Sequence, residues 1–145
     1  MHKGNTEFED RYIGEVIIAM SDRKRLNRIS GLLEANRINF SCVEKSIPLL
    51  YSAMRLNPGA IVLDLELEGA EGLDILPVLK RVNPNVPIIV ISEDPSEETQ
   101  AAAMGYSLHY YLIEPIRKDD FVLAVTSALE YQERRSYMAS IVRIK

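Results

Sequence analysis

Carboxylate and hydroxyl side chains follow several short apolar segments of this chain. Asp64 closes one such segment, Ser92 and Glu114 directly follow two others, and Asp22 follows a fourth with one residue between. Buried parallel strands bring their carboxyl ends to one edge of a sheet, where α/β proteins bind their ligands. We therefore expect these four side chains to converge. Their oxygens are ligands of the kind that Mg²⁺ and Ca²⁺ accept.

Apolar and amphipathic segments alternate along the chain. Five short apolar runs predict buried strands over residues 16–20, 38–43, 60–65, 88–91 and 109–113. The segments between and after them predict helices over residues 23–36, 47–56, 73–82, 95–104 and 117–134. This alternation predicts an α/β fold, a doubly wound five-stranded parallel sheet in the order 2-1-3-4-5 with flavodoxin-like topology.

Length and composition indicate one domain. The chain has 145 residues, of which 47% are hydrophobic, enough for one sizeable core. We expect a disordered leader over residues 1–14, a domain over 15–135, and a tail over 136–145. This apolar tail extends the last helix, docks back or meets a partner. The apolar runs are too short to cross a membrane and no signal peptide is evident, which favours a cytoplasmic protein without membrane contact.

Charge and cysteine content narrow the classes further. The net charge of −4 disfavours general nucleic-acid binding, and the residues after the last predicted helix are too few for a DNA-binding module. Cys42 is the only cysteine, so we expect no intrachain disulfide and a buried thiol. Arg23, Lys24, Arg25 and Arg28 crowd a predicted helix start, where the helix dipole disfavours cations. We interpret them as a solvated face.

In order and spacing these features resemble the receiver domain of response regulators, the two-component proteins of phosphorelay signal transduction. The resemblance covers residues 15–134. It implies that Asp64 is the phosphoacceptor, with loop residue Gly72 after it, and that Ser92 and Tyr111 are the hydroxyl and aromatic residues of the switch. Glu114-Pro115 stands where the family has Lys-Pro with a cis peptide bond. The resemblance also implies a sensor histidine kinase or other signalling protein as partner, with a homodimer as a candidate assembly.

Two departures from the family pattern concern charge. Met20 and Ser21 stand where the family has the acidic pair that binds Mg²⁺, with Asp22 one place late, and Glu114 replaces the lysine. Two carboxylates about 4 Å apart repel by roughly 4 kcal/mol at an effective dielectric constant of about 20, which would raise the pKa of one and oppose a phosphoryl group.

Two interpretations of these acidic residues remain open. In the first, they gather a divalent cation such as Mg²⁺ or Ca²⁺, with Asp64 and Glu114, and with Asp22 or Glu66, as candidate ligands. Alternatively, they remain at a disused site, either solvated or bonded to lysine and arginine.

Three functions fit the sequence. The first is an atypical receiver, or pseudo-receiver, that is not an enzyme and acts through protein contacts on its fourth helix, fifth strand and fifth helix, with phosphorylation of Asp64 in doubt. The second is a conventional phosphoprotein that uses Asp64, Asp22 and Mg²⁺. The third is a phosphohydrolase of the haloacid-dehalogenase type, with Asp64 as nucleophile and Glu66 as its acid-base partner.

Overall fold

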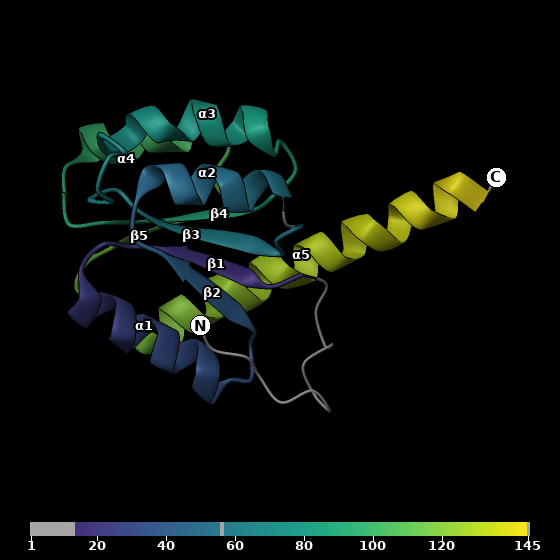
Figure 1. The fold of residues 1–145 in the computed structure, drawn as a ribbon, viewed down its shortest axis with the longest axis horizontal. Helices are drawn as coiled ribbons and strands as arrows, with labels where there is room; N and C mark the ends of the chain where they lie inside the picture. The colour runs from purple at the N-terminus through teal and green to yellow at the C-terminus, as the bar shows by residue number, and fades with distance from the viewer. Residues whose placement is uncertain (1–13, 56, 145) are drawn as a thin grey trace.

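The five apolar segments form one parallel sheet in the computed structural model, which describes residues 14–55 and 57–144 (Figure 1). The strand order β2-β1-β3-β4-β5 confirms the predicted topology. The predicted leader lies outside the described residues except for Gly14. The strands are β1 (Val16–Ala19), β2 (Phe40–Val43), β3 (Ala60–Asp64), β4 (Ile88–Ser92) and β5 (Tyr110–Ile113). The helices are α1 (Arg23–Ala35), α2 (Ser46–Arg55), η2 (a 3-10 turn, Gly72–Asp74), α3 (Ile75–Val82), α4 (Glu97–Met104) and α5 (Lys118–Ile144).

Helices cover both faces of the sheet, which explains why the strands are apolar without alternation. Figure 1 shows α1 and α5 on one face and α2, α3 and α4 on the other. Within β1, Ile18 packs with the α1 and α5 side chains, whereas Ile17 packs with those of α2 and α3, and both are fully buried. Burial of such a side chain contributes about 1.5–3 kcal/mol, so a polar residue at either position would destabilise the fold.

Two helices begin at residues that cap their free amide groups. The Asp22 carboxylate accepts hydrogen bonds from the backbone N–H groups of Lys24 at 3.0 Å and Arg25 at 3.2 Å, and so begins α1. Ser96 caps α4 in the same way through the amide of Thr99 at 3.2 Å. Such caps contribute about 1 kcal/mol each. The Asp22 carboxylate is therefore committed to the helix start.

The edge strand differs from what the sequence predicted, and the last helix continues into the predicted tail. Cys42 is exposed, so the prediction of a buried thiol is wrong. β2 pairs only with β1, and the helices cover only part of this edge strand. α5 continues to Ile144, so residues 135–144 are helical, which is one of the alternatives left open for the tail, and they project beyond the sheet (Figure 1). Among the described residues, no helix is both long and apolar enough to span a bilayer.

Candidate functional site

The strand register places three of the four predicted site residues side by side. Asp64 ends β3 opposite Ile91 of β4, and the next residue, Ser92, lies opposite Ile113 of β5. The backbone N–H of Glu114 then donates to the Ser92 carbonyl at 2.8 Å. The carboxyl ends of three neighbouring strands therefore meet at one edge, as the topology predicted.

Arg25, from the first turn of α1, lies between the two carboxylates of this edge. Its Nη1 donates to Oδ2 of Asp64 at 2.8 Å, and its Nε donates to Oε2 of Glu114 at 2.8 Å. Its Nη2 lies 2.8 Å from the same Glu114 oxygen and 3.5 Å from Oδ1 of Asp64. One planar guanidinium thus binds both acids, which suits its fork of donors. The predicted repulsion between the two acids is offset by a cation from the chain itself.

The three charged side chains are shielded from water. Burial disfavours the charged form of each one, whereas its bonding partners favour that form. Only 1% of the Asp64 side chain, 12% of Glu114 and 14% of Arg25 are exposed. Burial raises the pKa of Asp64, and the amide of Glu66 and the Arg25 guanidinium only partly offset this. For Glu114, burial also acts to raise the pKa, but Arg25, the Ile116 amide and Arg28 together outweigh it, and the pKa is lowered. Burial disfavours the charged form of Arg25, yet the two carboxylates raise its pKa overall.

Glu114 has further donors that fix its position. Arg28, one turn after Arg25 on α1, donates from Nη2 to Oε1 at 3.1 Å, and the amide of Ile116 donates to the same oxygen at 3.2 Å. The Glu114–Pro115 peptide bond is cis. Glu114 therefore joins the loop after β5 to α1, where the family has a lysine.

The interpretation of the basic residues as a solvated face is wrong for Arg25. Leu26, Ile29 and Leu33 form the buried stripe of α1, and Arg25 and Arg28 each precede one of its residues. Both arginines therefore lie along the flank of the stripe nearest the sheet edge. The sequence signal was present, because cations at a helix start are unfavourable unless an acid nearby compensates. The alternative that the acids bond to arginine describes Asp64 and Glu114 correctly.

The predicted magnesium ligands do not assemble. Asp22 caps α1, and the Glu66 side chain is exposed while its backbone N–H donates to Asp64 at 3.2 Å. The positions of the expected acidic pair hold Met20, which is fully buried, and Ser21, whose hydroxyl donates to the Glu44 carbonyl at 2.6 Å. Within residues 14–55 and 57–144, no group of three or more His, Cys, Asp or Glu side chains is placed to hold a metal. Asp22, Asp64 and Glu66 therefore do not form one group of metal ligands in the described part of the chain.

The two predicted switch residues point inward. The Ser92 side chain is buried, and its hydroxyl accepts from the Asp94 amide at 3.0 Å rather than bonding Asp64. Tyr111 packs against the apolar cluster under α2, α3 and α4. Its buried hydroxyl has no hydrogen-bond partner in the described part of the chain.

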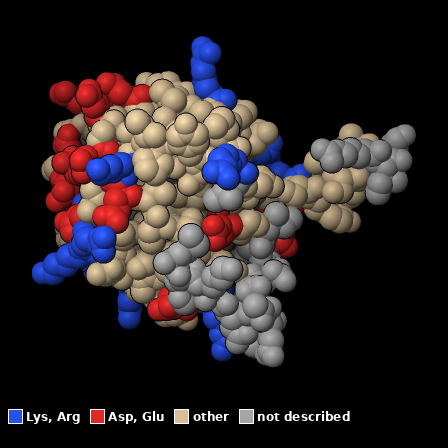
Figure 2. Space-filling model, in the orientation of Figure 1, with Lys and Arg blue, Asp and Glu red and all other residues tan. Residues whose placement is uncertain are grey.

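Acidic side chains surround the opening of this edge. Figure 2 shows them gathered at the left of the view, where the strands end, with some basic side chains among them. The loops after β3 and β4 contribute the exposed acids Glu66, Glu68, Glu71, Glu93 and Asp94. Glu93 also lies 3.8 Å from Nη1 of Arg25. The surrounding surface therefore disfavours an approaching anion.

Comparison with known proteins gives one consistent result. The family profile of the response regulator receiver domain matches residues 16–126. An NtrX-like response regulator of Rickettsia conorii is 30% identical over 118 residues, which are 80% of this chain and 25% of that protein. The regulatory protein LuxO of Vibrio cholerae is 30% identical over 92 residues, 63% of this chain and 20% of that protein. The chain thus spans at most about a quarter of the length of these relatives.

Solved structures agree on the fold. A CheY-like receiver domain of Methanospirillum hungatei superposes with a TM-score of 0.77 at 17% identity, covering 84% of this chain and 98% of that one. The receiver domain of a LuxO repressor protein from Vibrio parahaemolyticus gives a TM-score of 0.78 at 16% identity, covering 86% and 96%. At these identities the likeness concerns the arrangement of strands and helices alone.

Proposed function

The chain belongs to the response regulator receiver family, and from that premise we propose that it is an atypical receiver that signals through protein contacts, with Asp64 held by Arg25. The single observation that carries this proposal is the guanidinium bound to both Asp64 and Glu114.

Phosphorylation of Asp64 would work against this arrangement. Phosphoryl transfer to a carboxylate needs a cation across the oxygens and a positive side chain for the product. Here Asp64 already accepts from Arg25 and from the Glu66 amide, and Glu114 adds a negative charge where the positive one is needed. A phosphoryl group would have to displace the guanidinium and face Glu114 in a buried setting. The acidic rim adds to this barrier.

The contact face that we propose consists of α4, β5 and α5. β5 is an edge strand whose four residues are all half-buried, so its outer side stays accessible. Met104 of α4 is 46% exposed and Leu123 of α5 is 58% exposed, large apolar side chains that a partner would cover. The partner is a sensor histidine kinase, another signalling protein or a second copy of this chain.

The first test is chemical. The protein is incubated with Mg²⁺ and acetyl phosphate, beside a conventional receiver domain as positive control, and is weighed intact by mass spectrometry. We expect no phosphoryl adduct on the wild type while the control gains one. An adduct that disappears in Asp64→Asn would overturn the proposal in favour of a conventional phosphoacceptor. Turnover of a chromogenic phosphate ester, lost in the same variant, would instead indicate a phosphohydrolase.

The second test concerns the contact face. Leu123→Asp adds a charge to the α5 part of the face, and Ile47→Asp makes the same change on α2, where Ile47 is 65% exposed. Binding to a purified histidine kinase and self-association by analytical ultracentrifugation are measured for both variants. We expect Leu123→Asp to weaken one of these associations at least tenfold and Ile47→Asp to leave it unchanged. Equal behaviour of the two variants would argue against this face.

A further inference from the structure

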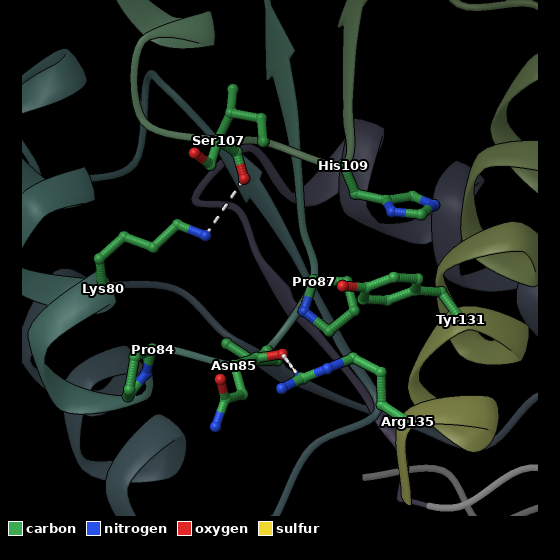
Figure 3. A pocket seen from close by; sticks show the side chains of 10 residues that line it. Lys80, Pro84, Asn85, Pro87, Ser107, His109, Tyr131 and Arg135 are labelled. Atoms are coloured by element: carbon green, nitrogen blue, oxygen red, sulfur yellow. Dashed lines mark hydrogen bonds between the residues drawn. The ribbon is translucent and has the colours of Figure 1, made fainter. Parts of the chain in front are cut away.

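A cavity of about 400 Å³ opens at the sheet edge opposite Asp64 (Figure 3). Pro87, directly before β4, and His109, directly before β5, belong to its lining, so the cavity lies where these strands begin. α3 contributes Lys80 and α5 contributes Arg135. The volume is in the range of small-molecule sites, which begin at about 300 Å³.

Two cations line this cavity, and no carboxylate of the described residues pairs with either of them. Lys80 donates from Nζ to the Ser107 carbonyl at 3.2 Å, and Arg135 donates from Nη1 to the Asn85 carbonyl at 3.0 Å. None of the lining residues is Asp or Glu, and the ion pairs of the described residues include neither Lys80 nor Arg135. Most of the N–H donors of both side chains are therefore free for a ligand.

The cavity lining is positively charged although the protein as a whole is acidic. The chain has a net charge of −4, yet the only charged side chains in the cavity lining are positive. Burial lowers the pKa of Lys80, because the ammonium loses water and no carboxylate of the cavity lining provides compensation. A bound anion would supply that compensation. Figure 3 shows Lys80 and Arg135 extending toward the cavity from opposite sides, which suits a ligand with several acceptor oxygens.

The rest of the lining combines the polar residues Asn85, Ser107 and His109 with apolar and aromatic surfaces. The Tyr131 ring lies under the Arg135 guanidinium, 5.8 Å from ring centroid to Cζ, and Figure 3 shows its hydroxyl end beside Pro87. Val86 and Leu108 line the cavity and are buried. Proline and tyrosine surfaces of this kind pack well against a planar ring.

We propose that this cavity binds a small phosphate ester with a planar ring, of about mononucleotide size. The phosphate oxygens accept from the Lys80 ammonium and the Arg135 guanidinium together, and the ring packs against Pro87 and Tyr131. A phosphate suits this pair better than a single carboxylate, because its additional oxygens can accept from two cations on opposite walls at once. The site is separate from Asp64 and does not depend on whether that residue is phosphorylated.

The test uses AMP and UMP as probes, with inorganic phosphate and adenosine as partial ligands, by isothermal titration calorimetry on the whole chain. We expect saturable binding of at least one nucleotide, and at least tenfold weaker binding of both partial ligands. Lys80→Met and Arg135→Gln should each weaken nucleotide binding about tenfold or more. Arg81→Gln, an exposed neighbour of Lys80 on α3, is the matched control and should bind as the wild type does.

Each other result contradicts the proposal. It is overturned if neither nucleotide binds, if adenosine binds as tightly as AMP, or if inorganic phosphate binds as tightly as either nucleotide. It is also overturned if Arg81→Gln weakens binding as much as Lys80→Met does. Thermal melting of every variant keeps a loss of fold distinct from a loss of binding.

Discussion

The charged side chains at the two ends of the strands differ in how they are paired. We call the end where the parallel strands finish the carboxyl edge and the end where they begin the amino edge. At the carboxyl edge, Arg25 binds Asp64 and Glu114, so every buried charge has a partner of opposite sign. At the amino edge, Lys80 and Arg135 bond only backbone carbonyls within the described residues. A carbonyl satisfies a donor's geometry but does not neutralise its charge. The first edge is closed by its own side chains, whereas the second has room for a ligand.

In a receiver domain phosphorylation is expected at the carboxyl edge, and in this chain Arg25 binds both Asp64 and Glu114 at that edge. At the amino edge, Lys80 and Arg135 line a cavity and have no carboxylate partner among the described residues. The substitutions below test whether the two edges differ in energy as they do in geometry.

The largest effect is expected from Arg25→Met. The variant leaves Asp64 and Glu114 buried without their cation, and removal of one partner of a buried ion pair costs about 3–5 kcal/mol. The free energy of unfolding is measured by urea denaturation at pH 7. Arg23→Met is the control, because Arg23 pairs with Glu44 at 3.1 Å but is 75% exposed. Exposed pairs contribute about 0–1 kcal/mol.

A double variant separates charge from packing at this position. Arg25→Met with Glu114→Gln removes the repulsion between the acids and should recover part of the lost stability. If Arg25→Met is no less stable than Arg23→Met, the carboxyl edge is not an energetic cluster, and the contrast between the edges fails.

A smaller effect, with a defined pH dependence, is expected from Glu114→Gln. The substitution replaces the charged carboxylate that accepts from Arg25 and Arg28 with a neutral amide. Hydrogen bonds to a charged group contribute about 1.5–3 kcal/mol, so part of this stabilisation is lost. The pKa of Glu114 is lowered on folding from its ordinary value of 4.5. Its stabilisation is therefore present above about pH 4.5 and is lost as the pH falls through the folded pKa.

The measurement is urea denaturation between neutral and acid pH. Glu114→Gln should lower the free energy of unfolding at pH 7 and reduce its fall on acidification. Glu133→Gln, an exposed acid of α5, should follow the wild-type curve. The pKa of Asp64 is raised on folding, so its contribution to stability changes with pH in the opposite direction to that of Glu114. A steeper fall in the free energy of unfolding of Glu114→Gln than of the wild type would contradict the role assigned to Glu114.

The sequence predicted the topology and most of the carboxyl edge for separate physical reasons. Runs such as Ile88–Ile91 are apolar at every position, which requires helices on both faces and a parallel sheet. That topology brings Asp64, Ser92 and Glu114 to one edge without further information. The partner of Glu114 was not predictable in the same way, because it depends on how α1 is rotated about its axis, and packing of Leu26 and Ile29 sets this rotation.

The amino-edge cavity was beyond sequence reasoning for a related cause. Lys80 and Arg135 belong to helices on opposite faces of the sheet, and each looks like an ordinary surface cation of its helix. They meet at one cavity only because α5 runs along the sheet to the point where β4 and β5 begin. The proximity of Lys80 and Arg135 depends on how α3 and α5 pack on the sheet. The sequence of either helix alone does not predict it.

The smallest effect on stability is expected from Lys80→Met, and it sharpens the contrast with Arg25. Burial lowers the pKa of Lys80 on folding, so the charged form opposes folding, and stability rises with pH between the folded pKa and the unfolded value of 10.5. Methionine keeps the apolar stem and removes this cost. The free energy of unfolding at pH 7 should therefore stay within about 0.5 kcal/mol of wild type, with Arg81→Met as the exposed control. A loss as large as that of Arg25→Met would mean that the amino edge, too, depends on its cation for stability, because the carbonyl of Ser107 would then need the ammonium as Asp64 needs the guanidinium.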